Sequence, residues 1–205
     1  MTQPDACIVR ITGPEGKTRG TGFVICGDGR IATCAHVVEE MEPHVAFPGS
    51  EQRPAQVVAI DPVHDVAILK LEGELPPGAE AARLGNSAEG HYRNFRTRGY
   101  RPLGELQGIP AEGRVVQAVS ECPGGLYLPL ILKSQDIRKG MSGAPVYIPD
   151  ADLVVVGSYV PQGVQVEPES ALGERQPPML QPGAFHRILA RACHNPILSA
   201  LEVTN

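Results

Sequence analysis

Residues 22–34 read GFVICGDGRIATC. Two runs rich in β-branched and aliphatic side chains, Gly22–Cys26 and Arg30–Cys34, flank the tripeptide Gly27-Asp28-Gly29. Short apolar runs separated by a turn that contains Gly and Asp are typical of a β-hairpin. The stretch therefore predicts two antiparallel strands joined by a tight turn.

The same pattern continues on both sides of this hairpin. Further strands are expected wherever a short run of β-branched or aliphatic residues lies between turn residues. These runs are Cys7–Thr12, Val45–Phe47, Ala55–Asp61, Val66–Leu71, Phe95–Tyr100, Gly113–Val119, Tyr127–Leu132, Gly143–Ile148 and Leu153–Val160. Many short strands at such spacing favour a sandwich or barrels over alternating β and α units.

Three segments depart from the strand pattern. Gly73–Ala82 is rich in Pro, Gly and Ala, and we interpret it as the connection between two halves of the chain. Pro161–Gly183 is rich in Pro, Gln and Glu and predicts a long exposed loop. Ala184–Ala192 (AFHRILARA) has apolar side chains at helical spacing, which predicts a C-terminal helix. The length of 205 residues suits one domain or two tightly packed halves.

The composition excludes some classes of protein. The net charge is −5, from 18 basic and 23 acidic residues, which gives no reason to expect the basic face of a nucleic-acid-binding protein. The longest apolar runs have the length of strands and fall short of a membrane span. Aromatic residues make up 4% and Trp is absent, so the core is expected to consist mainly of Val, Ile, Leu and Ala.

The five cysteines are an odd number, and no two of them form a CxxC pair. This pattern predicts buried thiols in a reducing compartment, and it predicts neither a metal site nor a cofactor. The first residues, MTQPDACIVRI, lack a basic region followed by a long apolar run, so no secretory signal is expected. We therefore expect a cytoplasmic protein that does not associate with membranes.

Three segments carry residues suited to catalysis: TCAH at 33–36, DVAIL at 65–69 and GMSGAP at 140–145. Each segment alone is weak evidence for catalysis, since each also fits an ordinary turn or strand end. Together they supply a histidine, an aspartate and a serine in that order. A serine hydroxyl attacks an amide at neutral pH only when a base removes its proton, and histidine has the pKa suited to that task.

With GTGFVI before the histidine and RLGNS near the midpoint, these segments resemble the trypsin-like peptidases, above all HtrA-like and related bacterial members. The resemblance covers about residues 6–160. It implies an all-β fold of two antiparallel six-stranded barrels of the chymotrypsin type. We expect one peptidase domain over residues 1–205, with barrels at about 5–80 and 90–165, then the loop and C-terminal helix within 161–205.

The resemblance also implies site residues. His36, Asp65 and Ser142 match the positions of the catalytic triad, and the backbone N–H groups of Gly140 and Ser142 match those of the oxyanion hole. His64 is a second histidine beside the aspartate. If the strand at Val66 included both, neighbouring side chains would point to opposite faces, so we interpret His64 as structural.

Asp136 lies six positions before the serine, where an acid in trypsin-like peptidases sits at the base of the primary specificity pocket. This position predicts cleavage after Arg or Lys. The alternative is that the carboxylate of Asp136 pairs with the neighbouring Arg138 or Lys139.

Ser158, Tyr159 and Val160 resemble the strand that forms one wall of that pocket and binds the substrate backbone. Many relatives carry Gly at the position of Val160. The larger side chain here would narrow the entrance and weaken the expectation of a basic-residue preference.

Met141 precedes the serine where secreted digestive members carry an Asp that pairs with a newly cut N-terminus. We therefore expect another form of regulation, by a regulatory protein or sensor module that acts on the loop Pro161–Gly183 or on the segment Lys139–Ser142. The resemblance extends to peptidase domains of bacterial signalling and defence systems.

The expected partners are a protein or peptide substrate and a regulatory protein, with no nucleic acid and no membrane. The alternative is a catalytically silent binding module with a protease fold. The complete set of three catalytic residue types argues against that alternative, since a scaffold requires none of them.

Overall fold

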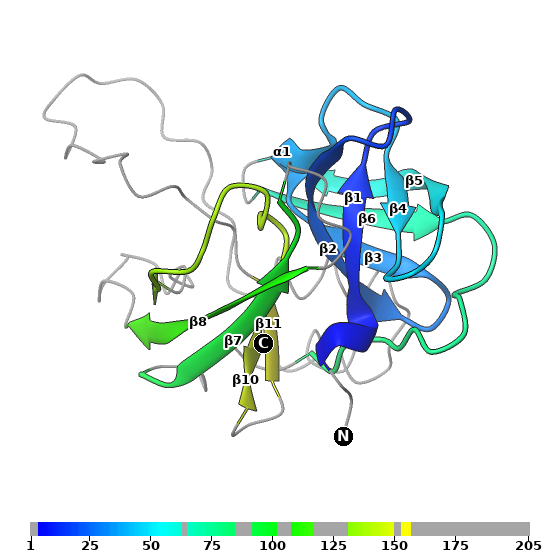
Figure 1. Cartoon of the computed structure of the whole chain (residues 1–205). Helices are drawn as coiled ribbons and strands as arrows, with labels where there is room; N and C mark the ends of the chain where they lie inside the picture. The colour runs from blue at the N-terminus through cyan, green and yellow to red at the C-terminus, as the bar shows by residue number, and fades with distance from the viewer. Residues whose placement is uncertain are drawn as a thin grey trace, which may run out of the picture.

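The computed structural model describes residues 4–62, 65–84, 92–101, 108–116, 131–149 and 153–156. Within these ranges the chain is almost entirely β-structure (Figure 1). In chain order the elements are η1 (Pro4–Cys7), β1 (Ile8–Thr12), β2 (Thr18–Cys26), β3 (Arg30–Thr33), α1 (Ala35–Val38), β4 (His44–Ala46), β5 (Gln52–Asp61), β6 (Val66–Leu71), β7 (Asn94–Gly99), β8 (Ile109–Val116), β9 (Ile131–Lys133), β10 (Pro145–Ile148) and β11 (Leu153–Val156).

The first six strands form a closed barrel in the order β1-β2-β3-β6-β5-β4. All neighbouring pairs are antiparallel, and the pairing of β1 with β4 closes the barrel. The predicted hairpin joins β2 to β3, where Cys26 pairs with Arg30. Asp28 stabilises its turn by accepting the N–H of Arg30 at 3.2 Å.

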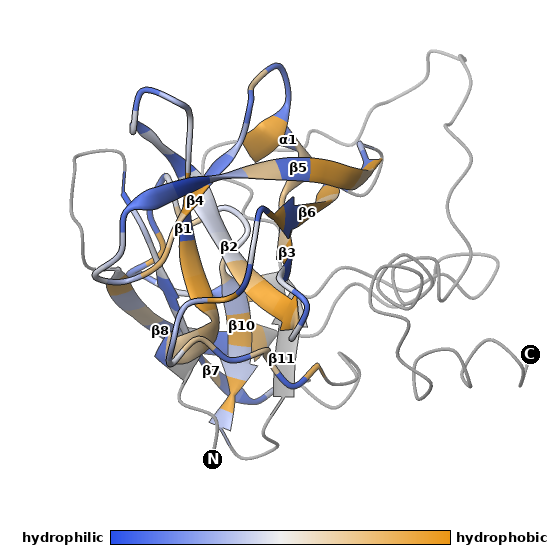
Figure 2. Ribbon diagram, turned by 90° about the vertical axis from the view of Figure 1, so that its right-hand side faces the viewer, coloured by the Kyte–Doolittle hydropathy of each residue, from blue (hydrophilic) through white to orange (hydrophobic). Residues whose placement is uncertain are grey.

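The interior of the barrel is filled mainly by aliphatic side chains, with the aromatic residues Phe23, Phe47 and Tyr100, as the low aromatic content predicts. The side chains that are at most 2% exposed include Ile8, Val9, Ile11, Phe23, Val24, Ile31, Ile68 and Leu69. Figure 2 shows hydrophobic residues concentrated on the barrel strands. Burying one such side chain contributes about 1.5–3 kcal/mol relative to leaving it in water.

The second half contains a five-stranded sheet in the order β11-β10-β7-β8-β9. Its smaller core consists of Phe95, Val115, Val146 and Ile148. The sequence predicts a six-stranded second barrel, and the residues expected to complete it, at 117–130 and 157–165, lie outside the described residues. The predicted loop and helix within 161–205 also lie outside them.

The all-β prediction is confirmed, and every predicted strand overlaps an observed one. Within the described residues the largest differences are at strand starts, since β2 begins at Thr18 rather than Gly22, and β8 at Ile109 rather than Gly113. The added part of β2 is polar and carries no apolar pattern. It is a strand because its backbone pairs with β1, where Thr12 lies opposite Thr18.

Between the halves, the predicted connection Gly73–Ala82 runs along the first barrel. The N–H of Ala82 donates to the carbonyl oxygen of Val24 at 2.8 Å, and the N–H of Glu80 donates to that of Ala6 at 3.1 Å. Tyr100, from the second half, packs into the core of the first barrel. The two halves are therefore joined by a buried interface.

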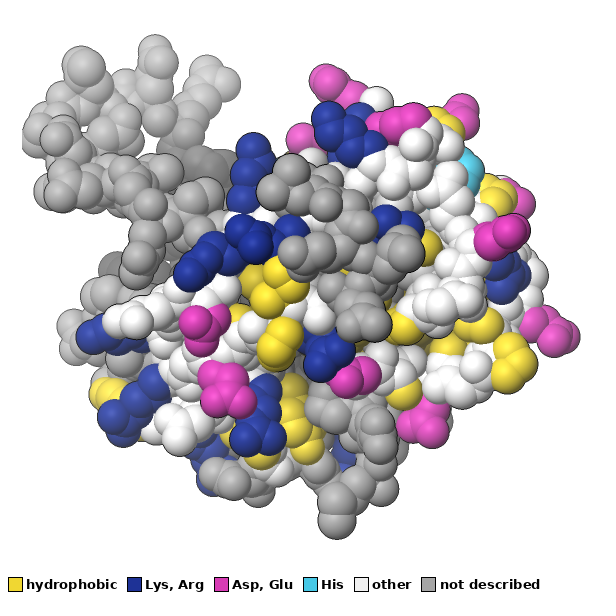
Figure 3. Space-filling model, viewed as in Figure 1, with side chains coloured by type: hydrophobic (Ala, Val, Ile, Leu, Met, Phe, Trp, Pro, Cys, Tyr) yellow, Lys and Arg dark blue, Asp and Glu magenta, His cyan; other side chains and the backbone are white. Residues whose placement is uncertain are grey.

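Charged side chains of both signs lie on the face shown in Figure 3, with Lys and Arg gathered on the side of the second sheet. Part of this charge is paired, since Arg96 lies 3.2 Å from Glu112 and Arg98 lies 3.1 Å from Asp5. Among the described helices, none combines the length and the apolar character that crossing a membrane requires.

Candidate active site

His36 lies on α1, directly after β3. The other three residues of this short helix are buried, whereas the His36 side chain is 48% exposed. Its ring is oriented by Asp65, whose Oδ2 and Oδ1 lie 2.8 Å and 2.9 Å from Nδ1. The backbone N–H of His36 also donates to Oδ1 of Asp65 at 2.9 Å. One carboxylate thus holds both the ring and the backbone of the histidine.

The pairing of β3 with β6 explains why these residues meet. Thr33, at the end of β3, lies opposite Ala67, near the start of β6. His36 follows the end of β3 and Asp65 precedes the start of β6. Because these two strand ends are neighbours, His36 and Asp65 lie at the same edge of the barrel.

Asp65 itself lies before β6 rather than within it, because its φ of 54° is left-handed. Asp tolerates this conformation better than most residues do. The expectation about His64 assumed a strand that included Asp65, whereas β6 begins at Val66. His64 lies outside the described residues.

Ser142 lies in a buried loop, and its own exposure is 8%. Thr21 of β2 holds this loop against the first barrel. The backbone N–H of Thr21 donates to the carbonyl oxygen of Ser142 at 2.9 Å, and its hydroxyl donates to that of Gly140 at 3.0 Å. The same hydroxyl accepts the N–H of Tyr100 at 2.9 Å, and Thr33 donates to the carbonyl oxygen of Thr21 at 2.7 Å.

Gly143 allows the loop to approach the helix that carries the histidine. Its φ is +83°, and a Cβ there would lie 2.1 Å from the carbonyl oxygen of Thr21, 2.5 Å from Oγ1 of Thr33 and 3.1 Å from the amide nitrogen of Cys34. The segment after Ser142 therefore packs directly on the chain that leads into α1. The structure thus brings the serine loop to the edge of the barrel where His36 and Asp65 meet.

Gly140 occupies the third position of a β-turn, in which the N–H of Met141 donates to the carbonyl oxygen of Arg138 at 3.2 Å. The φ of Gly140 is +97°. A positive φ at this position is typical of a type II turn, whose central peptide is flipped relative to type I. The turn therefore fixes the direction of the peptide group between Lys139 and Gly140.

Met141 is 3% exposed and packs in an apolar cluster with Ala111, Ala144 and the partly buried Ile137. Its sulfur accepts the N–H of Arg138 at 3.3 Å. Secreted digestive peptidases carry a carboxylate at this position, whereas this chain carries the apolar side chain of Met141. The contacts of Met141 with its apolar neighbours therefore hold the serine loop.

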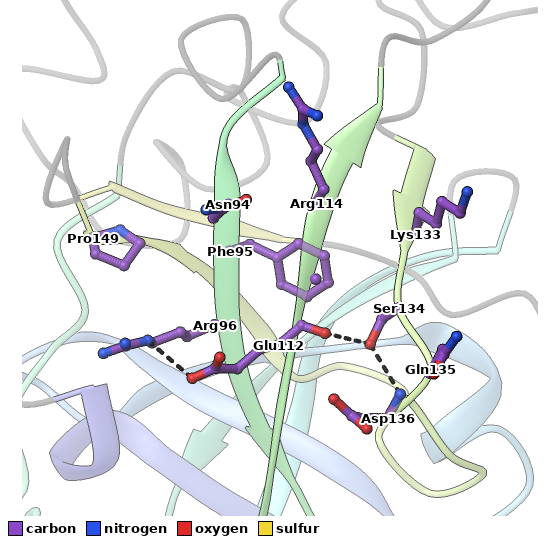
Figure 4. A pocket seen from close by; sticks show the side chains of 11 residues that line it. Asn94, Phe95, Arg96, Glu112, Arg114, Lys133, Ser134, Gln135, Asp136 and Pro149 are labelled. Carbon is purple, nitrogen blue, oxygen red and sulfur yellow. Dashed lines mark hydrogen bonds and ion pairs between the residues drawn. The ribbon is translucent and has the colours of Figure 1, made fainter.

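Asp136 lines an open hollow at the end of the second sheet (Figure 4). Ser134 positions its backbone, since the hydroxyl of Ser134 accepts the N–H of Asp136 at 3.1 Å and donates to the carbonyl oxygen of Glu112 at 2.5 Å. The Asp136 side chain is exposed, and Arg138 donates to backbone carbonyl oxygens instead of to it. Ser158, Tyr159 and Val160 lie outside the described residues.

Sequence reasoning missed the roles of Thr21 and Cys34. Thr21 lies within the GTGFVI motif, which signalled the family but not the contact with the serine loop. The sulfur of Cys34, a ring nitrogen of His36 and a carboxylate oxygen of Asp65 all lie within 4.8 Å of one another. The motif TCAH contains Cys34, but only the fold brings Asp65 to it.

Known structures share this fold. The HtrA-type protease AlgW, in a structure with a decapeptide, matches with a TM-score of 0.60 and 20% identity, over 71% of this chain and 44% of that one. Deg5 matches with a TM-score of 0.60 and 22% identity, over 73% of this chain and 77% of that one. At this identity the likeness supports the chymotrypsin-like fold alone.

A curated relative in Ectopseudomonas mendocina (strain ymp), a "Probable periplasmic serine endoprotease DegP-like", is 31% identical over 147 residues. The match covers 71% of this chain but 30% of that relative. A protein of Chlamydia pneumoniae with the same name is 27% identical over 158 residues, which are 73% of this chain and 31% of that protein.

The expectation of a cytoplasmic protein is wrong on this finding, since both relatives are named periplasmic. That expectation rested on the odd number of cysteines and on the first residues of the chain. Neither feature defines a compartment. Buried thiols are compatible with any compartment, because burial and not the surrounding redox potential keeps them from pairing.

Residues 20–157 match the family model described as "Trypsin-like peptidase domain". This range includes the histidine, aspartate and serine segments and every strand of the fold except β1 and the first two residues of β2. The predictions of a trypsin-like, HtrA-related chain of the serine endopeptidase class are thereby confirmed at the level of the family. The chain belongs to the trypsin-like peptidase domain family.

Proposed function

We propose that this domain is a serine endopeptidase in which Ser142 is the nucleophile, His36 the general base and Asp65 the residue that orients the base. The observation that carries the proposal is the double contact of Asp65 with the ring and backbone of His36, at the barrel edge against which the serine loop packs. The substrate class is protein or peptide.

In this mechanism Nε2 of His36 accepts the hydroxyl proton of Ser142 as the serine attacks the peptide carbonyl, and later delivers that proton to the leaving amine. Asp65 keeps the proton of the imidazole on Nδ1 and stabilises the imidazolium that forms. Backbone N–H groups of Gly140 and Ser142 would bind the developing oxyanion. Each such donor contributes about 3–4 kcal/mol. The positive φ of Gly140, which is typical of a type II turn, supports this arrangement.

The test compares wild type with Ser142→Ala and His36→Ala on an unfolded protein substrate and with a fluorophosphonate probe. Loss of a triad member is expected to lower turnover by about 10⁴–10⁶. Ser50→Ala is the matched control, because Ser50 is exposed in a loop and lies outside this site. Equal cleavage by wild type and Ser142→Ala would overturn the assignment.

We propose a preference for cleavage after Arg or Lys, directed by Asp136, with the wall of the pocket formed by Ser158, Tyr159 and Val160. The contribution of Asp136 is supported by its carboxylate, which lines the hollow without an ionic partner among the described residues. Because the carboxylate is exposed, we expect a modest preference.

We also propose that a regulatory protein or attached sensor module controls the activity. Met141 supports this proposal, because this buried apolar residue stands where secreted digestive members carry the carboxylate that pairs with a new N-terminus. Activation by that pairing therefore does not apply here. The setting in a bacterial signalling or defence system rests on the resemblance alone and stays a prediction. The names of the relatives favour a location outside the cytoplasm.

A fluorophosphonate titration tests the regulation. Slow labelling of Ser142 in the purified chain that accelerates when a partner is added is the expected result. Rapid stoichiometric labelling of the chain alone, together with fast peptide turnover, would show that no activation is required.

A further inference from the structure

Three side chains of different chemistry converge at the barrel edge. The donor atoms of Cys34, His36 and Asp65 lie within 4.8 Å of one another. Cys34 is 1% exposed, whereas the side chains of His36 and Asp65 are 48% and 28% exposed. The cluster therefore has a buried thiol at its base and two ligand groups that solvent can reach.

The fold holds the three donors in place. Cys34 lies between β3 and α1, in an extended conformation with φ −78° and ψ 147°. Asp65 is tied to the same segment through the backbone N–H of His36. Gly143 packs on the amide of Cys34, so the segment is fixed from the side of the serine loop as well.

We propose that Cys34, His36 and Asp65 form an inhibitory zinc site. Zinc takes thiolate, imidazole and carboxylate ligands at about 2.0–2.3 Å, and two donors of a tetrahedral zinc ion lie about 3.3–3.6 Å apart. The sulfur of Cys34 lies within 4.8 Å of the other two donors, so it needs to approach them by at most about 1.5 Å. Nδ1 of His36 and Oδ2 of Asp65 are 2.8 Å apart, so they would separate by about 0.5 Å if both bound the ion. The exposed side of His36 and Asp65 gives the ion a path to the thiol.

Three protein ligands leave a fourth position for water. On binding, the proton of the Cys34 thiol and any proton on the ligating ring nitrogen are released to solvent, because zinc ligands bind in deprotonated form. No redox step is involved, and a chelator reverses the binding.

Zinc in this site would stop catalysis whichever nitrogen of His36 it takes. Bound to Nδ1, it breaks the hydrogen bond with Asp65. Bound to Nε2, it blocks the atom that accepts the serine proton. Only this consequence rests on the proposed function, since the binding of the ion depends on the three donors alone.

The test uses the full chain, freed of metal with a chelator, and Co²⁺ as a spectroscopic probe for zinc. Wild type is expected to bind one equivalent and to show the near-ultraviolet absorption of a thiolate–cobalt bond. Cys34→Ala is expected to lose this band and to bind zinc at least about 100-fold more weakly by calorimetry. Cys34→Ser is the second variant, which keeps the size of the side chain but supplies no thiolate.

Cys26→Ala is the matched control, because it removes a cysteine outside the cluster and should keep the band. Cys7 should not compete, because burial raises the pKa of its thiol to about 12. A band that persists in both Cys34 variants, or no band in wild type, would overturn the site.

The inhibition is measured separately, as the ratio of peptidase activity with zinc to activity with chelator within each variant. Wild type should lose at least about 90% of its activity and both Cys34 variants much less. If the metal-free wild type neither cleaves peptides nor labels with the fluorophosphonate probe, the proposed function fails, and the cobalt band still decides the site. If zinc binds through Cys34 but leaves the activity unchanged, the inhibitory role is wrong.

Discussion

The side-chain hydroxyl of Thr21 donates a hydrogen bond of 3.0 Å to the carbonyl oxygen of Gly140, 119 positions further along the chain. The hydroxyl also accepts the N–H of Tyr100, and the backbone N–H of Thr21 donates to Ser142. One residue of the first barrel thus holds both the serine loop and the end of β7. Thr33, three residues before His36, donates to the carbonyl oxygen of Thr21 at 2.7 Å, so the positions of the nucleophile and of the base depend on the same strand.

Thr21→Val keeps the shape of the side chain but removes the hydroxyl. We expect the free energy of unfolding to fall by about 2–4 kcal/mol, because the buried N–H of Tyr100 and the carbonyl oxygen of Gly140 each lose a partner. We expect kcat to fall as well, because the serine loop loses an anchor. Urea denaturation and peptide hydrolysis below the transition measure the two effects.

Thr18→Val is the matched control on the same strand. The hydroxyl of Thr18 is buried without a hydrogen-bond partner among the described residues, so its removal should leave stability within about 0.5 kcal/mol or raise it. Equal destabilisation by the two substitutions would mean that the hydrogen bonds of Thr21 do not hold the loop.

Gly143→Ala tests the close contact between the serine loop and the first barrel. A Cβ at Gly143 would overlap the carbonyl oxygen of Thr21, and the positive φ adds strain, so we expect a loss of about 2–5 kcal/mol and of activity. Gly49 has a φ of +73°, but a Cβ added there would meet no other atom within 4 Å. Gly49→Ala should therefore cost only about 1–2 kcal/mol. Thermal unfolding of both variants separates the cost of steric overlap, expected only at Gly143, from the cost of backbone strain, expected at both positions.

Asp65→Asn tests the orientation of the histidine. Asn tolerates the left-handed backbone of this position, so the fold should be retained. The amide presents a donor where Nδ1–H of His36 requires an acceptor, which favours the wrong tautomer, and we expect kcat to fall by about 10⁴. Asp28→Asn, in the β2–β3 turn, is the control and should keep full activity. An Asp65→Asn enzyme within tenfold of wild type would exclude the proposed role.

Local sequence was sufficient for the parts of the molecule that depend on near neighbours. The hairpin at Gly27-Asp28-Gly29 could be predicted because turn chemistry and apolar runs are local signals. The polar start of β2 at Thr18 could not, because only its pairing with β1 makes it a strand. The hydrogen bonds of Thr21 and the proximity of Cys34 to Asp65 depend on contacts between distant segments, which no spacing in the sequence records.

Asp136→Asn tests the preference for basic residues. Its carboxylate lines the hollow of Figure 4 but is exposed, and exposed ion pairs contribute little. We therefore expect wild type to cleave after Arg or Lys about two- to fivefold faster than after Gln, measured as kcat/KM. Asp136→Asn should abolish this difference and leave cleavage after Gln unchanged.

Glu112→Gln is the matched control for this experiment, because Glu112 lines the same hollow but is paired with Arg96 at 3.2 Å. Its neutralisation should leave the preference in place, since its charge is already compensated. If Ala or Val substrates outrun Arg and Lys substrates in wild type, Asp136 does not direct specificity. In that case the size of Val160 would decide which side chains enter, and Val160→Gly should then restore access to long side chains.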